Sequence, residues 1–390
     1  MLTAANSLRG ERRNGLPTAS LQLAVRRRNP RDGQGLPGGV GLGAYRLSVQ
    51  HGLQEPDYRA YAAAGMEALQ RWYGRWSGCW RTTGWWNSAN ALTALIAYIQ
   101  RTGDQTHLSV LERTFRAARR MHSDFLVSFY DDNAWWGLAW VAAYDLTGDD
   151  RYLDAARTIF ANLLTGWDDA CGGGVWWNTE RRYKNAITNE LFLSLAARLH
   201  QRCPGTGDYL DWARREWDWF CARGLVGAAG LVNDGLDGSC ENNRGQTWTY
   251  NQGVVLGGLA ALYEITGDAS HLRQGEAIAD AVLGSLTIGA PDAKHGILLE
   301  PGEHNTARSD GDRPQFKGIF VRNLYDFYRQ SPRPAYSEFI RDNARSIWAN
   351  NRNSRNQFGL HWAGPFDYAD ASRQSSAQDV LNAAVPLGAG

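Results

Sequence analysis

The sequence predicts an all-α fold in which six inner and six outer helices alternate around a ring, an (α/α)6 toroid. The tripeptide Thr-Gly-Asp occurs four times, at residues 102–104, 147–149, 206–208 and 266–268. Each copy follows an apolar run of helical length and precedes an amphipathic run. Such repetition of one unit indicates a fold assembled from helical hairpins.

Each Thr-Gly-Asp is predicted to be the turn of one hairpin. Gly ends helices in the left-handed conformation because it lacks a β-carbon, and Asp favours the N-cap of a following helix. The helix before each turn should therefore end at the Gly, and the next helix should begin after the Asp.

The runs before the turns are apolar or small on every side, which is typical of helices that are buried all round. They lie at residues 90–101, 134–146, 189–201 and 252–265, and two similar runs without the tripeptide lie at 316–330 and 375–387. These six runs are predicted to form the inner layer. A binding site is expected where their N-termini and the preceding loops converge.

The outer layer is predicted from amphipathic runs in which apolar residues recur at intervals of three and four. They lie at residues 57–75, 105–122, 149–165, 208–223, 268–286 and 334–350. An open solenoid of hairpins fits the same repeat, but it predicts a concave binding surface in place of one polar cleft.

Composition limits the classes of partner. With 390 residues, 43% of them apolar and 21% charged, the chain can bury the core of one large domain. Its 41 basic and 40 acidic side chains give a formal net charge of +1, so no long-range field favours nucleic acid or an acidic membrane. No apolar stretch reaches the roughly 18 residues of a membrane span. We expect a neutral substrate, no nucleic-acid partner, no membrane span and a monomer.

The first 54 residues differ from the rest. Residues 1–50 contain eight Arg against Glu11 and Asp32, with almost no aromatic side chains. We predict that residues 1–54 form a basic, disordered extension and that residues 55–390 form the folded domain. Neither an export signal nor an anchor is recognisable, which on sequence alone indicates the cytoplasm and leaves the compartment open.

The five cysteines give no metal or disulfide pattern. They lie at positions 79, 171, 203, 221 and 240, with no CxxC pair and no zinc spacing. Their odd number argues against a disulfide framework, so they are expected to be mainly small buried hydrophobic residues. The CGGG run at 171–174 lacks the Lys of a phosphate loop and is predicted to be a turn. No cofactor and no metal site is predicted.

Aromatic and amide side chains alternate where the inner helices begin. The candidates are Trp85, Trp86, Asn87, Asn90, Asp131, Asp132, Trp135, Trp136, Tyr183, Lys184, Asn185, Asn189, Thr249, Tyr250, Asn251, Gln252, Phe316, Lys317, Gln374, Ser375 and Ser376. A sugar offers hydroxyl groups around its rim and C–H bonds on its faces, so amides, carboxylates and aromatic rings complement it. The helix starts are therefore predicted to bind a carbohydrate, although most of the 17 Trp must belong to the core.

These helix starts contain no histidine. Nucleophiles activated by His and HExxH zinc sites therefore have little support. A sugar epimerase on the same fold would need paired catalytic histidines in the cleft, and a glycan-binding module would need no catalytic group. Both remain alternatives to a hydrolase.

The adjacent pair Asp131 and Asp132 is the candidate for the chemistry. Glycoside hydrolysis needs one group to protonate the leaving oxygen and another to attack or stabilise the anomeric carbon, and two carboxylates suffice. Adjacent carboxylates can reach the ~5–5.5 Å separation of a retaining enzyme more easily than the ~6.5–9.5 Å of an inverting one.

The backbone and charge of this pair also have expected features. Neighbouring residues diverge by about 100° on a helix, so we expect the pair on irregular backbone before Ala134. One carboxylate should stay ionised at the helix N-terminus, and its neighbour's charge and nearby indole rings should raise the pKa of the other. A second pair, Asp168 and Asp169, is predicted to serve a turn or cap.

Several motifs together resemble one known family. WWNSANALTALIAY, YDDNAWWGLAW, GGGVWW, YKNAITNELFLSLAARL, WTYNQGVVLGGLAALYEITGD and FKGIFVRNLYDF occur in this order, and the resemblance that they carry covers roughly residues 55–388. They are similar to glycoside hydrolase family 76, the α-1,6-mannanases. The resemblance implies an (α/α)6 catalytic domain that hydrolyses α-1,6-linked mannan with retention, with Asp131 as nucleophile and Asp132 as acid/base.

The same resemblance implies a partner, α-mannan or a mannose-containing oligosaccharide. Its substrate-binding residues are expected to be Trp86, Asn87, Asn90, Trp135, Trp136, Tyr183, Lys184, Asn185, Asn189, Tyr250, Asn251, Gln252, Phe316 and Lys317. We expect endo action, although exo-acting and glycan-transferring relatives share these motifs.

Overall fold

A computed structural model describes residues 56–305 and 310–388. This part of the chain contains twelve α-helices and four short strands. None of its helices is both long enough and apolar enough to cross a membrane. The predicted extension at residues 1–54 lies outside the described residues.

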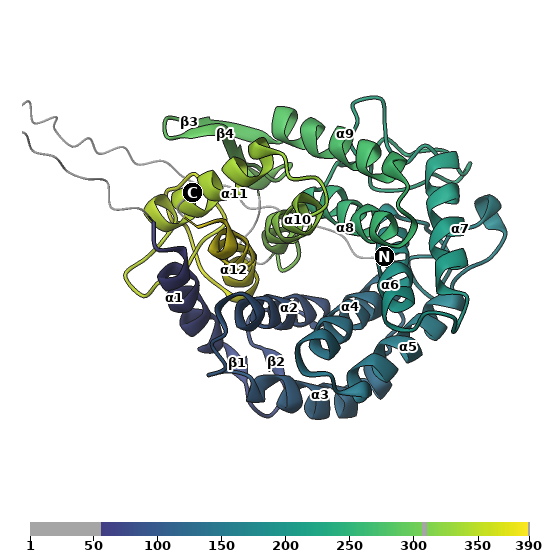
Figure 1. The fold of residues 1–390 in the computed structure, drawn as a ribbon, viewed down its shortest axis with the longest axis horizontal. Coiled ribbons are helices and arrows are strands. Elements are labelled where there is room, and N and C mark those ends of the chain that lie inside the picture. The colour runs from purple at the N-terminus through teal and green to yellow at the C-terminus, as the bar shows by residue number, and fades with distance from the viewer. Residues whose placement is uncertain (1–55, 306–309, 389–390) are drawn as a thin grey trace, which may run out of the picture. The chain divides into compact units, whose positions relative to one another are not determined.

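Six inner helices form a closed ring (Figure 1). They are α2 (Trp85–Thr102), α4 (Tyr130–Thr147), α6 (Ala186–Arg202), α8 (Thr249–Thr266), α10 (Arg313–Tyr328) and α12 (Ala371–Ala384). Each packs on the next, and α12 packs back on α2, which closes the circle. The closed ring confirms the toroid and excludes the open solenoid, because the two ends of a solenoid do not meet.

Six outer helices surround the ring and alternate with the inner ones along the chain (Figure 1). They are α1 (Tyr58–Gln70), α3 (Ser109–Met121), α5 (Asp150–Leu164), α7 (Tyr209–Ala222), α9 (Ala269–Ser285) and α11 (Pro334–Asn350). All six lie within the predicted amphipathic runs. The strands form two antiparallel hairpins: β1 (Tyr73–Gly74) with β2 (Cys79–Trp80), and β3 (Thr287–Ala290) with β4 (Ala293–Leu298).

Three of the four Thr-Gly-Asp turns have the predicted geometry. Gly103, Gly148 and Gly267 are left-handed and end α2, α4 and α8. At the remaining copy, residues 206–208, the prediction was wrong, because α6 ends at Arg202, before the tripeptide. The Asp caps the next helix in only two copies: the Asp149 carboxylate accepts from the N–H of Arg151, and that of Asp268 from the N–H of Ser270.

Close contact between inner helices depends on glycine. A β-carbon on Gly253 of α8 would lie 2.4 Å from the Cα of Phe320, and one on Gly318 of α10 would lie 2.4 Å from the carbonyl oxygen of Ser376. These neighbours are backbone atoms of adjacent inner helices, which cannot turn aside as a side chain can. Glycine therefore sets the spacing of α8, α10 and α12.

We predict that Gly318→Ala lowers the free energy of unfolding by about 1–3 kcal/mol, because the added methyl group must push α10 away from α12. The matched control is Gly284→Ala in the outer helix α9, where a β-carbon meets nothing within 4 Å. That change should stabilise the protein by about 0.5–1 kcal/mol, because alanine restricts the unfolded chain more than glycine does. Urea unfolding followed by circular dichroism measures both, and equal effects would contradict the close packing.

Candidate active site

A cavity of about 440 Å³ lies at the end of the ring where the inner helices begin. Nine residues predicted from the sequence line it: Trp86, Asn87, Asp131, Asp132, Trp135, Tyr183, Asn185, Tyr250 and Phe316. Five lining residues were not predicted: Gly84, Phe129, Trp177, Asp234 and Asp312. The cavity therefore occupies the position expected from the convergence of helix starts.

The two adjacent aspartates occupy the first turn of α4. The expectation of irregular backbone was wrong, because α4 already begins at Tyr130. A short segment holds this helix start in place: the N–H of Tyr130 donates to the carbonyl of Trp177 (2.9 Å), and that of Thr179 to the carbonyl of Ser128 (2.9 Å). Both carboxylates thus lie where N–H groups of the first turn have no helical partner.

Hydrogen bonding distinguishes Asp131 from Asp132. The Trp177 indole N–H donates to Oδ2 of Asp131 (2.9 Å), and the backbone N–H of Asp132 donates to Oδ1 (2.9 Å). The carboxyl group of Asp132 has no hydrogen-bond partner among the described residues, although it lines the cavity. Donors thus orient and stabilise the ionised form of Asp131, whereas Asp132 remains available to an added molecule.

Burial raises the pKa of both aspartates well above the ordinary value. For Asp131, burial outweighs the donors from Asp132 and Trp177 that lower the pKa. For Asp132, the charges of Asp131 and Asp312 add to the effect of burial and raise the pKa further. The sequence predicted that one carboxyl group would stay ionised at the helix N-terminus, whereas burial raises the pKa of both. When the pair holds one proton, we place it on Asp132, because described residues donate hydrogen bonds to the carboxylate of Asp131 and none to that of Asp132.

Two further carboxylates make the cavity strongly acidic. The hydroxyl of Tyr183 and the indole N–H of Trp248 (3.0 Å) donate to Asp234. The indole N–H of Trp86 donates to Asp312 (2.9 Å). None of the described residues that line this cavity is Lys, Arg or His. A neutral ligand with many hydroxyl groups suits such a wall, whereas an anionic ligand would be repelled.

Aromatic rings form the remaining walls. The rings of Tyr250 and Phe316 stack with their centroids 3.8 Å apart, and those of Trp86 and Trp135 stack at 5.6 Å. Stacking in pairs restricts the motion of each ring, because a ring cannot turn without losing its neighbour. The cavity therefore combines rigid apolar walls with carboxylates, as the complement of a sugar requires.

Seven predicted binding residues do not line the cavity: Asn90, Trp136, Lys184, Asn189, Asn251, Gln252 and Lys317. Trp136 is fully buried and stacks on Trp140 in the core. Asn90 accepts a hydrogen bond from Arg322, and Asn251 is buried within α8. Side chains on one helix turn cannot all face the centre, so proximity to a helix start did not guarantee contact with the cavity.

Four of these seven residues form hydrogen bonds that connect the loops around the cavity, here called the rim, to the inner helices. Lys184 donates to Asp168 (2.9 Å) and to the carbonyls of residues 170 (2.6 Å) and 173 (2.7 Å). Lys317 donates to Glu303 (2.6 Å) and to the carbonyl of residue 360 (2.8 Å). Asn189 and Gln252 exchange hydrogen bonds with the backbones of residues 175 and 232. Their buried polar groups are satisfied by protein partners.

Some of the five lining residues that were not predicted could have been found from the sequence, and others could not. Asp312 directly precedes α10, so placing that helix start at residue 313 would have found it. Trp177 belongs to GGGVWW, a motif noted for the resemblance but not for its chemistry. Asp234 lies in the connection between α7 and α8 and has no local signal. Asp168 and the glycine run form a turn as predicted, with Gly172, Gly173 and Gly174 at positive φ.

The disulfide expectation was wrong. Cys171 and Cys240 form a disulfide with their Cα atoms 5.2 Å apart. Cys79 and Cys203 are partly buried and Cys221 is exposed, so none of the three free cysteines is a fully buried residue. The bridge joins the α5–α6 connection, which carries Trp177, to the α7–α8 connection, which carries Asp234. Pairing across 69 residues depends on loops that only the fold brings together.

Comparison with known proteins places these features in a family context. The family described as glycosyl hydrolase family 76 matches residues 59–386. A putative mannan endo-1,6-alpha-mannosidase of Schizosaccharomyces pombe is 30% identical over 266 residues, 62% of this chain and 58% of that protein. A mannan endo-1,6-alpha-mannosidase of Saccharomyces cerevisiae is 33% identical over 211 residues, 50% of this chain and 45% of that protein. The chain thus spans about half the length of these curated relatives.

Solved structures extend the similarity across the domain. An inactive alpha-1,6-mannanase variant of Salegentibacter sp., with two adjacent aspartates replaced by alanine, was solved with alpha-1,6-mannotetrose. It is 27% identical to this chain with a TM-score of 0.77, over 85% of this chain and all of the other. A protein of Listeria innocua is 25% identical with a TM-score of 0.74, over 85% and 97% of the two chains.

We predict that the double change Cys171→Ser with Cys240→Ser lowers the free energy of unfolding by about 2–4 kcal/mol, because the unfolded chain loses a long closed loop. It should also weaken ligand binding in the cavity, because Trp177 and Asp234 lie on the two bridged loops. Thermal unfolding measures the first effect, and titration with the alpha-1,6-mannotetrose that was solved with the Salegentibacter protein serves as a probe of the second. Cys221→Ser, at an exposed free thiol, is the control. Unchanged stability and binding would contradict this role.

We predict that Asp132→Asn stabilises the folded protein increasingly as the pH rises. A carboxyl group whose folded pKa is raised takes up its proton more readily in the folded state, so ionisation above the unfolded pKa penalises folding. The gain should be small near pH 4, grow up to the folded pKa and then level off. Urea unfolding between pH 4 and 9 measures the difference, with Asp169→Asn as an exposed control. A gain that shrinks with rising pH would contradict the raised pKa.

Proposed function

The chain belongs to glycosyl hydrolase family 76, and we propose that it is an endo-acting hydrolase of α-1,6-linked mannan that retains the anomeric configuration. The observation that carries the proposal is the adjacent carboxyl pair on α4, oriented differently by its hydrogen bonds and facing a cavity walled by aromatic rings. Relatives named as mannan endo-1,6-alpha-mannosidases support the linkage and the endo action.

In the first step we assign Asp131 as the nucleophile and Asp132 as the acid. The donors from Trp177 and from the backbone of Asp132 orient the ionised Asp131 carboxylate. An oxygen of Asp131 attacks the anomeric carbon while the glycosidic bond breaks. Asp132 gives its proton to the departing oxygen. Its raised pKa favours this transfer, and so does the absence of a hydrogen-bond partner for its carboxyl group among the described residues.

In the second step Asp132 changes from acid to base, and Asp131 becomes the leaving group. Once its proton has left, Asp132 is a carboxylate and can accept a proton from water as the water oxygen attacks the anomeric carbon. The ester bond to Asp131 then breaks, and the electron pair returns to the carboxylate. Two inversions give a product with the α configuration of the substrate.

The character of the cavity also supports a neutral sugar chain as substrate. Asp234 and Asp312 can accept hydrogen bonds from sugar hydroxyls, while Trp86 and Phe316 offer ring faces to C–H bonds. A carboxylated or phosphorylated sugar would add negative charge beside four carboxyl groups, and the described lining residues include no counter-charge. We therefore propose that the cavity at this end of the ring binds unmodified mannan.

The deciding experiment measures reducing ends released from linear α-1,6-mannan. We expect Asp131→Asn and Asp132→Asn each to lower turnover by about 10³-fold or more while the folded protein still binds the glycan. The control is Asp169→Asn, which removes one carboxylate of the other adjacent pair. Asp132→Asn should recover activity on substrates whose leaving group needs no protonation. Near-normal activity on mannan in either variant would refute the assignment.

The configuration of the first product tests the mechanism separately. Anomeric proton signals recorded before mutarotation should show an α product. An initial β product would contradict retention, and activity only on α-1,2- or α-1,4-linked glycans would discard the linkage. Binding without turnover by the unaltered protein would favour a glycan-binding module, and formation of an epimer would favour an epimerase.

A further inference from the structure

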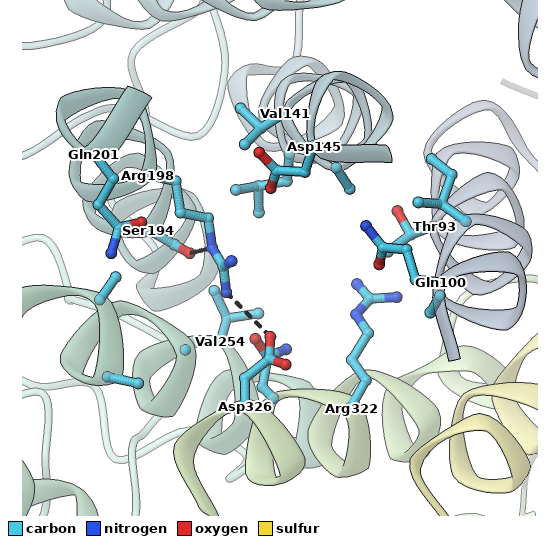
Figure 2. A pocket seen from close by; sticks show the side chains of 18 of the residues that line it. Thr93, Gln100, Val141, Asp145, Ser194, Arg198, Gln201, Val254, Arg322 and Asp326 are labelled. Atoms are coloured by element: carbon cyan, nitrogen blue, oxygen red, sulfur yellow. Dashed lines mark hydrogen bonds and ion pairs between the residues drawn. The ribbon is translucent and has the colours of Figure 1, made fainter. Parts of the chain in front are cut away.

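A second cavity, of about 340 Å³, opens at the opposite end of the ring, where the inner helices end. Five inner helices line it, and Figure 2 shows polar side chains from α2, α4, α6 and α10 directed toward its centre. Trp135 lines both cavities and so lies between them. The proposed hydrolysis makes no use of this second cavity.

The carboxylates of this cavity already have partners. Both oxygens of Asp145 accept from Arg202, and both oxygens of Glu264 accept from glutamine side chains. One oxygen of Asp326 accepts from Arg198 (3.2 Å), and the other pairs with a neighbouring arginine at 4.0 Å. The three acidic side chains of the wall therefore have no unoccupied oxygen.

The guanidinium groups, in contrast, keep unused donors. Nη1 of Arg101 is buried and has no hydrogen-bond partner in the described part of the chain. Arg198 donates only through Nε and Nη2, to Ser194 (3.4 Å) and Asp326 (3.2 Å), which leaves Nη1 without a partner among the described residues. Arg329 is exposed at the mouth, and its side chain has no partner in the described part of the chain. A guanidinium carries five N–H groups, so the wall has an excess of donors.

Neutralisation of helix C-termini does not fully explain these arginines. The negative ends of the inner helices do meet here, and cations near the last turn stabilise them. Arg322, however, lies in the middle of α10, with its guanidinium 5.7 Å from the centroid of Trp135. It pairs with the buried Asp379 (3.1 Å) and donates to Asn90. The described lining contains five arginines and three carboxylates. Asp379, which lies outside the lining and pairs with Arg322, neutralises one further positive charge.

We propose that this second cavity binds a small organic oxyanion, a phosphate or carboxylate carried on a body no larger than a monosaccharide. Oxyanions are acceptors only, so they match donors whose protein partners are missing, and guanidinium groups bind them in charge-assisted pairs. The volume lies at the lower end of the range for small-molecule sites, which excludes a polymer. Gln100 and Asn323 can bind hydroxyl groups of the body.

The test is isothermal titration of the intact protein at low ionic strength with four probes: a hexose 6-phosphate, a hexuronate, inorganic phosphate and the unmodified hexose. We expect saturable binding of at least one organic oxyanion and none of the hexose. The better probe distinguishes a phosphorylated from a carboxylated ligand. Asp131→Asn should bind the same probe unchanged, so that failure of the hydrolase proposal and failure of this one remain separable.

Arginine variants locate the binding. Arg198→Gln should weaken the affinity by about tenfold, because a charge-assisted hydrogen bond is lost. Arg329→Gln should weaken the affinity by a smaller factor. Because the side chain of Arg329 is exposed, this change should leave the fold intact. Arg157→Gln, exposed on α5 and paired with Asp154, removes the same charge outside the cavity and should change nothing.

Three outcomes would overturn the proposal. They are no heat of binding with any oxyanion up to ~10 mM, equal loss of affinity in Arg157→Gln and Arg198→Gln, and displacement of the probe by an α-1,6-linked mannotetraose. The first would mean that the arginines serve only the helix ends. The second would indicate nonspecific charge attraction, and the third would place the anion in the acidic cavity.

Discussion

The parallel direction of the six inner helices is the constraint on which the rest of the structure depends. Because each inner helix is followed by an outer helix that returns the chain, all inner N-termini meet at one end and all C-termini at the other. The aligned helices give the two ends opposite partial charges. Carboxylates gather at the positive end, around Asp131 and Asp132, and guanidinium groups at the negative end, around Arg101 and Arg198.

Close packing of these helices makes the ring narrow enough for side chains to divide its interior. Gly253 and Gly318 allow backbones of neighbouring helices to touch, so the central space is small. Trp135 lines the cavities on both sides, and Arg322 lies near its ring. One ring of helices can therefore present two chemically opposite cavities without mixing their charges.

The acidic end carries an energetic cost that the surrounding loops help to offset. Four carboxyl groups share a cavity with no cation among its described lining residues, and burial raises the pKa values of Asp131 and Asp132. Such a cluster disfavours folding when it is ionised. The loops that enclose the cavity are held by hydrogen bonds from buried lysine and amide side chains and by the disulfide between residues 171 and 240.

The sequence by itself determined the helices, their alternation between layers and the adjacent aspartates, because these depend on periodicity and turn chemistry within short windows. Tertiary structure decided which polar residues face the cavity. Lys184 and Lys317 stand at helix starts, as Tyr183 and Phe316 do, yet the lysines point to loops and the aromatic rings to the cavity. Asp234 and Cys240, the disulfide partner of Cys171, both lie in the α7–α8 connection, far along the chain from the residues that they meet. Neighbours across the ring are set by packing between helices, and a local pattern holds no information about them.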